Sequence, residues 1–378
     1  MRGVYLTYSN SADGQRRLTP RVEDHVILPV LSDHDVVVQV KACALSRVDT
    51  KLLSQLGIST EQVPVGSEIS GIVTKVGPSV LMFSVGDEVM GILPLDSECP
   101  GCAAYCSLPE YYLVKKPSGV SHSDAAATMR GGVMGYTALH HQCRIGAGSI
   151  VLLCSAASGE GLIMLQLCTA LGAKVIAVVH NDDEASLLKA LHLSLLKLVD
   201  LSSTSNLVDV CLQETGSLGV NCIIDAGVSP NYVLSDFLVD SASLRRQLEN
   251  ERYRYEYEDQ AHTQTIPPPP RKHQLISCLA TRGQWVTREP ALQLDPPDSQ
   301  LLLMKGASLH FLFEPGWTLS GANQGDYLDM LTSIASRLEN GTLKPYVYKT
   351  IILDQVCEEL GRLGGYGVGK IVMTTENK

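Results

Sequence analysis

A buried strand, a tight turn of small residues and a helix are predicted in succession between Ser149 and Cys168, and this arrangement could bind a phosphate group. The turn reads Ser155-Ala-Ala-Ser-Gly-Glu-Gly161. Such small side chains let a backbone approach a pyrophosphate, whose charge is favoured by the free N–H groups and the positive end of the following helix. Serine stands at Ser155 and Ser158, where the dinucleotide-binding fingerprint has its first two glycines. An ordinary strand-to-helix turn therefore explains the segment equally well when it is taken alone.

Three cysteines, Cys99, Cys102 and Cys106, have a spacing that could serve a metal ion. A closed tetrahedral zinc site needs four ligands, and no fourth Cys or His follows at a useful spacing. We therefore favour incidental thiols over a structural zinc site. The chain has eleven cysteines, an odd number, and most lie among apolar residues, which is typical of small buried side chains in a reducing compartment. This usage predicts a cytosolic protein.

The elements that must position these residues follow two different patterns. The first third of the chain contains alternating apolar runs, beginning at Asp35, Ile69 and Gly86 and separated by Gly and Pro, which predict the strands of a barrel or sandwich. From about Ser149 the pattern changes to strand, turn, amphipathic helix and strand, which indicates βαβ units around a parallel sheet. Strands buried on both faces are predicted at Ile150–Leu153, Lys174–Val179, Leu198–Asp200, Cys222–Asp225 and Gln284–Thr287.

The chain between the last two of these strands has a different composition. Residues 245–259 carry mixed charges and several tyrosines with no apolar period, and Ile266-Pro-Pro-Pro-Pro-Arg-Lys272 adds a run of prolines. We predict an exposed or disordered insertion at about residues 243–274. Pro267–Pro270 could serve as a polyproline II ligand for an SH3 or WW domain, although composition favours a solvated linker.

Regular patterns resume in the last part of the chain. The spacing of apolar residues predicts a helix over Tyr327–Leu338. Segments beginning at Leu343 and Gly367 have the composition of strands again, and we expect them to return to the first domain.

The length of 378 residues predicts about two domains, and 45% hydrophobic with 19% charged residues is typical of a globular chain. A net charge of -10 and a pI near 5.5 work against an electrostatic hold on nucleic acid or anionic lipid. The start of the chain turns polar at Ser9 without the apolar region of a signal peptide, and no uncharged apolar run reaches about 18 residues. We expect a soluble protein that binds neither nucleic acid nor membranes.

The order of short motifs along the whole chain resembles the medium-chain dehydrogenase/reductase superfamily, particularly its zinc-free quinone oxidoreductase (zeta-crystallin) branch. Each motif is short, but together and in order they are specific. The matching segments are Val38–Asp49, Pro64–Val73, Val76–Val80, Phe83–Val89, Asp124–Ala127, Gly135–Leu139, the turn at 155–161, Gly219–Asp225 and Gly369–Val372.

The resemblance implies an α/β protein in which a GroES-like β-barrel domain, residues 1–122 and 341–378, accompanies a Rossmann domain with a doubly wound parallel sheet, residues 123–340. A cleft between them would bind NADPH and a small quinone or carbonyl substrate, and the nicotinamide would donate hydride directly. The family also implies a homodimer or a higher homo-oligomer formed through the edges of the Rossmann sheets. The pyrophosphate is assigned to Ala156, Ala157, Ser158, Gly159, Glu160 and Gly161.

The zinc-dependent members of the superfamily have a Cys and a His where this chain has Ser46 and Ser67, and serine is not a usual zinc ligand, so we expect no catalytic zinc. Enzymes that use NAD carry an acid at the end of the second Rossmann strand, and this place is Val179 here. The absence of a carboxylate favours NADP(H). The neighbouring His180 could donate a hydrogen bond to the adenosine 2′-phosphate or could be an exposed loop histidine.

Ser46, Asp49 and Lys51 would line the nicotinamide and substrate side of the cleft. Ser46 replaces an asparagine of the quinone reductases and Lys51 replaces a tyrosine, whereas Asp49 stays within the family's acidic range. We expect Asp49 to orient Lys51 or a substrate-bound water. A surface ion pair of little consequence is the alternative for Asp49 and Lys51.

Two further departures concern the path of the cofactor. Glu160 replaces the apolar residue of the family's phosphate loop. Its carboxylate and a phosphate charge about 6 Å away would repel each other by roughly 3 kcal/mol at an effective dielectric constant near 20, and by less if the side chain points to solvent. Arg288-Glu-Pro places a charged, rigid segment where the nicotinamide half would pass. Two hypotheses follow: an NADPH-dependent, zinc-independent oxidoreductase acting on a quinone or activated carbonyl, or a catalytically weak or inactive pseudoenzyme serving as a cofactor-binding or interaction scaffold.

Overall fold

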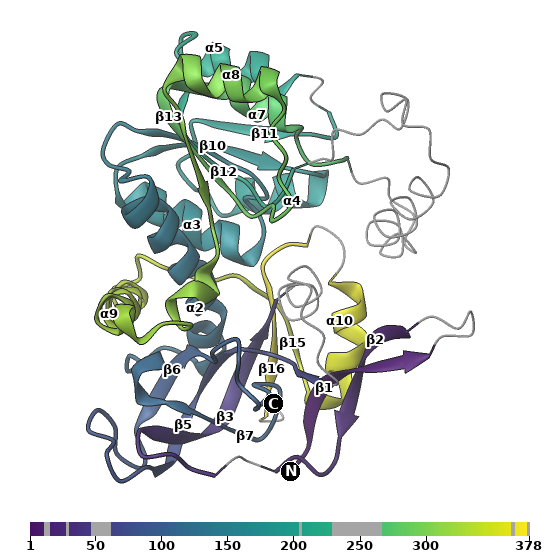
Figure 1. Cartoon of the computed structure of the whole chain (residues 1–378), viewed down its shortest axis with the longest axis vertical. Coiled ribbons are helices and arrows are strands. Elements are labelled where there is room, and N and C mark those ends of the chain that lie inside the picture. The colour runs from purple at the N-terminus through teal and green to yellow at the C-terminus, as the bar shows by residue number, and fades with distance from the viewer. Residues whose placement is uncertain are drawn as a thin grey trace.

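A computed structural model describes residues 1–10, 16–27, 30–46, 62–203, 206–228, 267–363 and 367–375. Within these ranges the chain forms two large sheets at opposite ends of the molecule, with helices between them (Figure 1). The predicted residues Asp49 and Lys51, and most of the predicted insertion, lie outside the described residues.

The first sheet is the predicted barrel. Its seven described strands run in the order β15-β16-β3-β5-β6-β8, with β7 also paired to β3. The strands are β3 (Asp35–Leu45), β5 (Glu68–Val76), β6 (Glu88–Ile92), β7 (Tyr105–Pro109), β8 (Leu113–Lys115), β15 (Val347–Ile351) and β16 (Lys370–Thr374). Because β16 pairs antiparallel with β3, Ile371 facing Leu45, the predicted return of the last strand to the first domain is confirmed. A smaller sheet beside it contains β1 (Gly3–Asn10), β2 (Arg16–Glu23) and β4 (Gln62–Pro64).

The second sheet is parallel throughout its described length and has the order β11-β10-β9-β12-β13-β14. The strands are β9 (Ile150–Leu153), β10 (Lys174–Val179), β11 (Lys197–Asp200), β12 (Val220–Ile224), β13 (Leu279–Thr287) and β14 (Ser308–Phe311). In chain order this is 3-2-1-4-5-6, the doubly wound arrangement, whose switch point lies between β9 and β12. Ligands of such sheets bind at the carboxyl ends of the strands beside that point. The predicted fold class is confirmed.

The helices between the sheets are α2 (His122–Tyr136), which continues into a π-helical turn η2 (Thr137–Gln142), α3 (Gly159–Ala170) and α9 (Gln324–Glu339). The helix predicted at Tyr327–Leu338 is therefore confirmed. The remaining helices are α4 (Asp182–Ala190), α5 (Leu207–Glu214), α7 (Lys272–Cys278), α8 (Pro296–Lys305) and α10 (Val356–Arg362), with short 3-10 turns η1 (Glu110–Tyr112), η4 (Glu314–Trp317), η5 (Gly321–Asn323) and η6 (Leu353–Gln355). No helix of the described ranges is long and apolar enough to cross a membrane.

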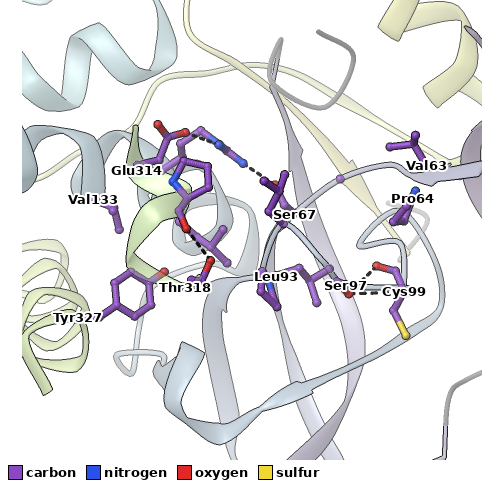
Figure 2. Close-up of a pocket in the computed structure, with 16 residues that line it drawn as sticks. Val63, Pro64, Ser67, Leu93, Ser97, Cys99, Val133, Glu314, Thr318 and Tyr327 are labelled. Carbon is purple, nitrogen blue, oxygen red and sulfur yellow. Dashed lines mark hydrogen bonds and ion pairs between the residues drawn. The ribbon is translucent and has the colours of Figure 1, made fainter. Parts of the chain in front are cut away.

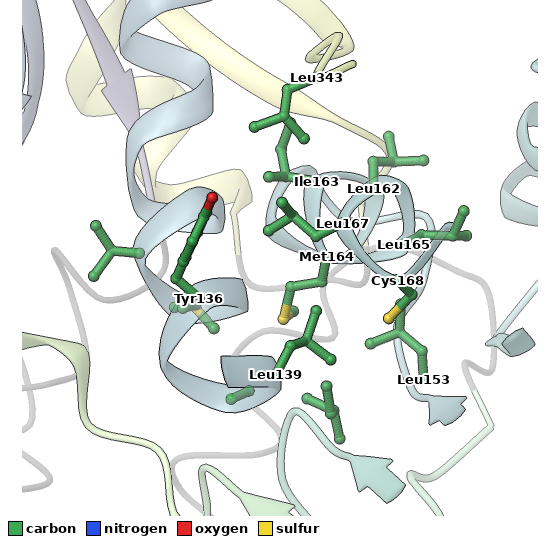
Figure 3. Close-up of a cluster of buried hydrophobic side chains, with 14 of the residues drawn as sticks. Tyr136, Leu139, Leu153, Leu162, Ile163, Met164, Leu165, Leu167, Cys168 and Leu343 are labelled. Carbon is green, nitrogen blue, oxygen red and sulfur yellow. The ribbon is translucent and has the colours of Figure 1, made fainter. Parts of the chain in front are cut away.

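Glycines on α2 let α3 and α9 approach it closely. A Cβ at Gly135 would lie 2.5 Å from Leu167 of α3, and a Cβ at Gly132 would lie 2.7 Å from Ile334 of α9. The residues around this contact are buried and apolar, and Figure 3 shows Tyr136 and Leu139 facing the side chains of α3. Dense apolar packing of this kind has little freedom to rearrange. It therefore fixes the position of α3, whose first turn follows the predicted phosphate-binding loop.

The predicted end of the insertion is wrong. The chain is ordered into α7 from Lys272, and Pro270 is buried. The Lys272 ammonium is also buried, and it lies 3.0 Å from the Asp298 carboxylate of α8. Such pairing lets a lysine leave water, which composition alone did not reveal. Residues 267–274 thus belong to the packed structure, whereas residues 243–266 lie outside the described part of the chain.

Candidate active site

The turn after β9 connects this strand to α3 at the carboxyl edge of the parallel sheet. Ser155 has a φ of 53°, in the left-handed region that favours glycine. The Ser158 hydroxyl caps α3, accepting a hydrogen bond from the Gly161 N–H at 3.0 Å and donating one to the Ser155 carbonyl at 2.8 Å. A Cβ at Gly161 would lie 2.3 Å from the same carbonyl oxygen. The Ser158 hydroxyl therefore satisfies the Gly161 N–H, which a glycine at position 158 would have left available to a ligand.

Glu160 turns its carboxylate into the molecule rather than to solvent, and its side chain is 17% exposed. The Lys370 ammonium of β16 lies 2.8 Å from its Oε1, and the Ser46 hydroxyl donates to the same oxygen at 3.3 Å. Burial opposes ionisation, but Lys370 and then the nearby Arg288 outweigh it and lower the pKa of Glu160 to about 2. The repulsion of a phosphate expected from the sequence is thus offset by a paired cation.

Lys370 joins Glu160 to a longer chain of buried charges. Its ammonium also donates to Glu68 of β5 at 2.6 Å, and Glu68 accepts from the Arg130 Nε of α2 at 3.3 Å. The Arg130 Nη1 in turn lies 2.5 Å from Glu314 of η4. We call these five residues, Glu160, Lys370, Glu68, Arg130 and Glu314, the charged chain. It crosses from the barrel sheet to the helices of the second domain.

The side chains of the charged chain are almost inaccessible to solvent. Glu68 is fully buried, and Arg130, Lys370 and Glu314 are 6% exposed or less. Burial raises the pKa of the Glu68 carboxyl despite Lys370 and Arg130, whereas the two carboxylates beside Lys370 raise its pKa against the effect of burial. Taking a charge out of water costs several kcal/mol unless it is paired, so each member depends on its neighbours.

A pocket opens beside the charged chain, between the barrel and η4 (Figure 2). Its empty volume is about 710 Å³, which includes space open to solvent. One end is polar because Arg130, Glu314 and Ser67 lie there, and the Arg130 Nη2 donates to the Ser67 hydroxyl oxygen at 2.6 Å. We call this space the cleft pocket. The rest of its wall is mostly apolar and consists of Val63, Pro64, Gly66, Ile92, Leu93, Pro94, Leu95, Ser97, Cys99, Val133, Pro315, Thr318 and Tyr327.

The structure tests one of the two expectations for His180, at the end of β10. The residue is 1% exposed, so it is not an exposed loop histidine, and that alternative is wrong. Its backbone N–H donates to the Glu184 carboxylate at 2.9 Å, and its ring lies 3.4 Å from the same oxygen. The exposed side chains at this corner are instead Asp182 and Asp183, in the first turn of α4.

The structure brings some of the predicted site residues together. Ser46, at the end of β3, lies against Glu160 of the loop. Ala156 and Ala157 are fully buried residues of the loop itself. Gly159 faces Lys370, whose Cγ would lie 2.4 Å from a Cβ at that position. The chain just before β16 is tied to the loop as well, since the Gly369 N–H donates to the Ala157 carbonyl at 3.0 Å.

Ser46 and Ser67 stand where zinc-dependent members of the superfamily have zinc ligands, and each forms a hydrogen bond with a residue of the charged chain. Ser46 donates to Glu160 and Ser67 accepts from Arg130. Cys99, Cys102 and Cys106 are buried, and the Cys102 thiol lies 3.7 Å from that of Cys43. Across the ranges that the structure describes, no three His, Cys, Asp or Glu side chains are grouped so as to hold a metal ion.

Sequence reasoning missed Lys370, Arg130 and Glu68, and it treated Ser67 only as a lost zinc ligand. A signal was present, because each of the three charged residues interrupts or borders an apolar run: Lys370 opens β16, Arg130 lies within α2, and Glu68 opens β5. Charged residues in such places are buried only when paired. The pairing itself could not be seen, since Lys370 is separated from Glu68 by 302 residues.

Comparison with solved structures shows the fold. A quinone oxidoreductase from Pseudomonas syringae pv. Tomato DC3000 superposes with a TM-score of 0.74, covering 99% of both chains at 20% sequence identity. A family profile described as "Alcohol dehydrogenase GroES-like domain" matches residues 32–147.

Among sequences, "Quinone oxidoreductase-like protein 1" of Mus musculus is 39% identical over 354 residues, 93% of each chain. The human "Quinone oxidoreductase" is 26% identical over 165 residues, 43% of this chain and 49% of that one. The protein therefore belongs to the quinone oxidoreductase-like family of the medium-chain dehydrogenase/reductase superfamily. Membership makes it an oxidoreductase that binds a nicotinamide cofactor and acts on a small molecule.

Proposed function

We propose that the protein transfers hydride from NADPH to a quinone or a related activated carbonyl compound without the help of zinc. One observation carries the proposal: the loop after β9, at the switch point of the parallel sheet, is joined to the cleft pocket by the charged chain. A dinucleotide on the loop and a substrate in the pocket would then share one site. When bound, the nicotinamide supplies the hydride.

The loop has features that suit a pyrophosphate. The first turn of α3 presents its positive end, and Lys370 crosses that turn over Gly159. Arg288, expected to obstruct the cofactor, adds a second cation near Glu160. A phosphate oxygen would compete with the Glu160 carboxylate for the Lys370 ammonium, and Glu68 would keep the ammonium in place.

The choice of NADPH rests on Val179, which ends β10 without a carboxylate that would hold a ribose 2′-hydroxyl. Asp182 and Asp183 lie beyond it in the first turn of α4, and their charges are exposed to solvent and screened by salt. His180 is buried against Glu184, so a contact with a 2′-phosphate would require its ring to move.

The absence of a zinc requirement is supported by what surrounds the two serines. A guanidinium lies 2.6 Å from the Ser67 hydroxyl oxygen, and a carboxylate paired with an ammonium lies beside Ser46. A second cation at this point would be repelled by Arg130 and Lys370. The protein's own share of catalysis is then to orient the two reactants and exclude water.

Pairing of Glu160 with Lys370 removes the main reason to regard the protein as an inactive scaffold. The other grounds were Lys51 and the tyrosine-rich segment, which lie outside the described residues. A deletion that tests the segment for a binding role should end before Pro267, because Lys272 is part of the packed structure.

Titration of the purified protein with NADPH and, separately, with NADH tests the proposal. Nicotinamide fluorescence is the readout, followed by turnover of 1,4-benzoquinone or 2-cyclohexen-1-one. We expect micromolar binding of NADPH, weaker binding of NADH, and activity that a zinc chelator does not lower. Tighter binding of NADH would contradict the choice of NADPH, and no binding of either nucleotide would contradict the whole proposal.

We also propose that two copies associate through β14. This strand is at the edge of the described sheet, and Phe311 and Phe313 beside it are 53% and 36% exposed. An unpaired edge with exposed aromatic residues is a template for another strand. Light scattering of the wild type and of Phe311→Lys tests this: the variant should be a monomer, and an unchanged dimer would exclude the edge.

The eleven cysteines are all free thiols in the structure, which supports placement in the cytosol. Cell fractionation, with disulfide-sensitive electrophoresis of the same samples, checks this.

A further inference from the structure

The hydroxyl of Ser67 differs from the other two aliphatic hydroxyls that line the cleft pocket. The Ser97 hydroxyl donates to the Cys99 carbonyl at 3.2 Å, and the Thr318 hydroxyl donates to the Pro315 carbonyl at 3.0 Å. The Ser97 oxygen also accepts from the neutral Cys99 N–H, whereas the Ser67 oxygen accepts from a charged donor, the Arg130 guanidinium, at 2.6 Å (Figure 2). An oxygen that accepts from a cation directs its own hydrogen elsewhere, and Ser67 lies in the pocket wall.

Acceptance of this bond makes the Ser67 O–H a stronger donor. Hydrogen bonds in a chain polarise one another, and a charged donor roughly doubles the strength of the bond that it makes. Arg130 is 3% exposed, so water screens its effect on Ser67 only weakly. The arrangement is also rigid, because Glu68 and Glu314 hold the guanidinium from two other directions.

The same two carboxylates decide which ligand the donor suits. They compensate the charge of Arg130, and Glu314 itself lines the pocket. A ligand in the pocket therefore meets a polarised O–H group rather than an uncompensated positive charge. A neutral oxygen acceptor is favoured there, whereas a carboxylate would be repelled by Glu314.

We propose that Ser67, polarised by Arg130, donates a hydrogen bond to the carbonyl oxygen of an uncharged substrate in the cleft pocket, which makes it a catalytic residue. This inference rests on the proposed function, since it concerns the acceptor side of the same hydride transfer. When the substrate binds, the Ser67 O–H is directed to the carbonyl oxygen, and the contacts that Ser67 makes besides that with Arg130 must give way. Negative charge grows on that oxygen as hydride reaches the substrate, so the hydrogen bond strengthens in the transition state.

The infrared carbonyl stretch of bound 2-cyclohexen-1-one tests the hydrogen bond without any turnover. It is measured on the full chain with and without oxidised dinucleotide, for the wild type, Ser67→Ala, Ser67→Cys and the control Ser97→Ala. We expect a lower frequency in the wild type and in Ser97→Ala. The frequency should return towards that of an unpolarised carbonyl in Ser67→Ala, with Ser67→Cys intermediate because a thiol is a weak donor. Equal frequencies in all four proteins, or no binding of the probe, would overturn the inference.

Kinetics provide a second readout. In Ser67→Ala, kcat should fall about 100-fold, as for the loss of an oxyanion donor, while the dinucleotide Kd stays close to wild type. The Tm should fall as well, because the Arg130 Nη2 loses its acceptor. A change in KM alone would assign Ser67 to binding and overturn the catalytic role. Ser67→Cys keeps the side-chain size and separates a lost donor from a packing defect.

An anionic analogue of 2-cyclohexen-1-one tests whether the pocket favours an uncharged ligand over a carboxylate. 1-Cyclohexene-1-carboxylate has a ring of the same size, and we expect it to bind at least about tenfold more weakly than the ketone. Tighter binding of the acid would show that Arg130 receives anions and would overturn the inference. Failure of the proposed function would appear separately, as absence of dinucleotide binding. The infrared comparison without dinucleotide would still test whether Ser67 donates a hydrogen bond to the carbonyl oxygen.

Discussion

The barrel and the second sheet meet through two kinds of contact. Around α2, α3 and α9 the contact is apolar, and glycines of α2 let the helices approach so closely that added methyl groups would collide. A few residues away, the charged chain crosses the same boundary by ion pairs that are almost free of water. Packing of apolar groups stabilises wherever it occurs, whereas buried ion pairs often contribute little net stability. We conclude that the apolar packing holds the two sheets together, whereas the charged chain fixes the positions of polar groups at the loop and the cleft pocket.

Lys370→Met breaks the charged chain at its centre and should have the largest effect. Glu160 and Glu68 would both lose their ammonium, and removing one partner of a buried pair typically costs about 3–5 kcal/mol. Urea unfolding monitored by circular dichroism gives the change. Lys115→Met is the control, because that lysine is 64% exposed in its pair with Asp87, and such pairs contribute about 0–1 kcal/mol. Similar losses in the two variants would contradict the comparison.

Acid should weaken the charged chain before the apolar contact. Glu160 has a pKa of about 2 in the folded protein, against 4.5 for the free side chain. Its ionised form therefore stabilises the fold fully above pH 4.5, and this contribution is lost as the pH falls from 4.5 towards 2. The full loss, reached below pH 2, is on the order of 3 kcal/mol by linkage, and about 2 kcal/mol of it is lost at pH 3. Unfolding free energies at pH 6 and pH 3 should differ more for the wild type than for Glu160→Gln; equal differences would show that Glu160 is not the titrating group.

Gly132→Ala tests the apolar contact. The new methyl group would lie 2.7 Å from the Ile334 side chain, so that side chain or α9 must shift, and overpacking of this kind costs about 1–3 kcal/mol. Thermal unfolding measures the change. Gly325→Ala near the start of α9 faces open space and should leave the Tm unchanged or slightly higher. A stable Gly132→Ala would mean that the helices are less tightly packed than the structure indicates.

Glu160→Val should have the smallest effect when the free energy of cofactor binding is measured, although it also removes the stabilisation that the ionised carboxylate gives the fold at neutral pH. It removes the carboxylate that competes for Lys370, while Glu68 still holds the ammonium. We expect the affinity for NADPH to rise by up to about tenfold, which corresponds to about 1.4 kcal/mol. Nicotinamide fluorescence measures the Kd. Weaker binding would show that Glu160 positions Lys370 for the cofactor rather than competing with it.

Local patterns were enough to predict much of the fold. The strands at Ile150–Leu153 and Lys174–Val179 agree with the structure to the residue, because each is a continuous apolar run between turn residues. The helix α7 was missed because a proline run and Lys272 made its start look solvated. Composition reports the average polarity of a segment and does not show that Lys272 pairs with Asp295, which precedes α8, and with Asp298 in α8.

The candidate site was less predictable than the fold. The small residues predict the loop at 155–161, but the fingerprint alone does not show that Ser158 caps α3. The pairing of Glu160 depends on Lys370, and nothing local in either segment shows that they meet. Side-chain direction was the missing information, since the same glutamate would repel a phosphate if it pointed along the loop.

The separation of Lys370 from its partners also bears on how the protein is made. It lies 302 residues after Glu68 and 210 after Glu160, so the site requires contacts that are among the most distant in the chain. Contacts of that kind form late in folding because a long segment must first be brought together. During synthesis the ribosome releases the parallel sheet before β16 exists. Until that last strand arrives, the nascent chain holds two carboxylates, Glu68 and Glu160, with no ammonium between them.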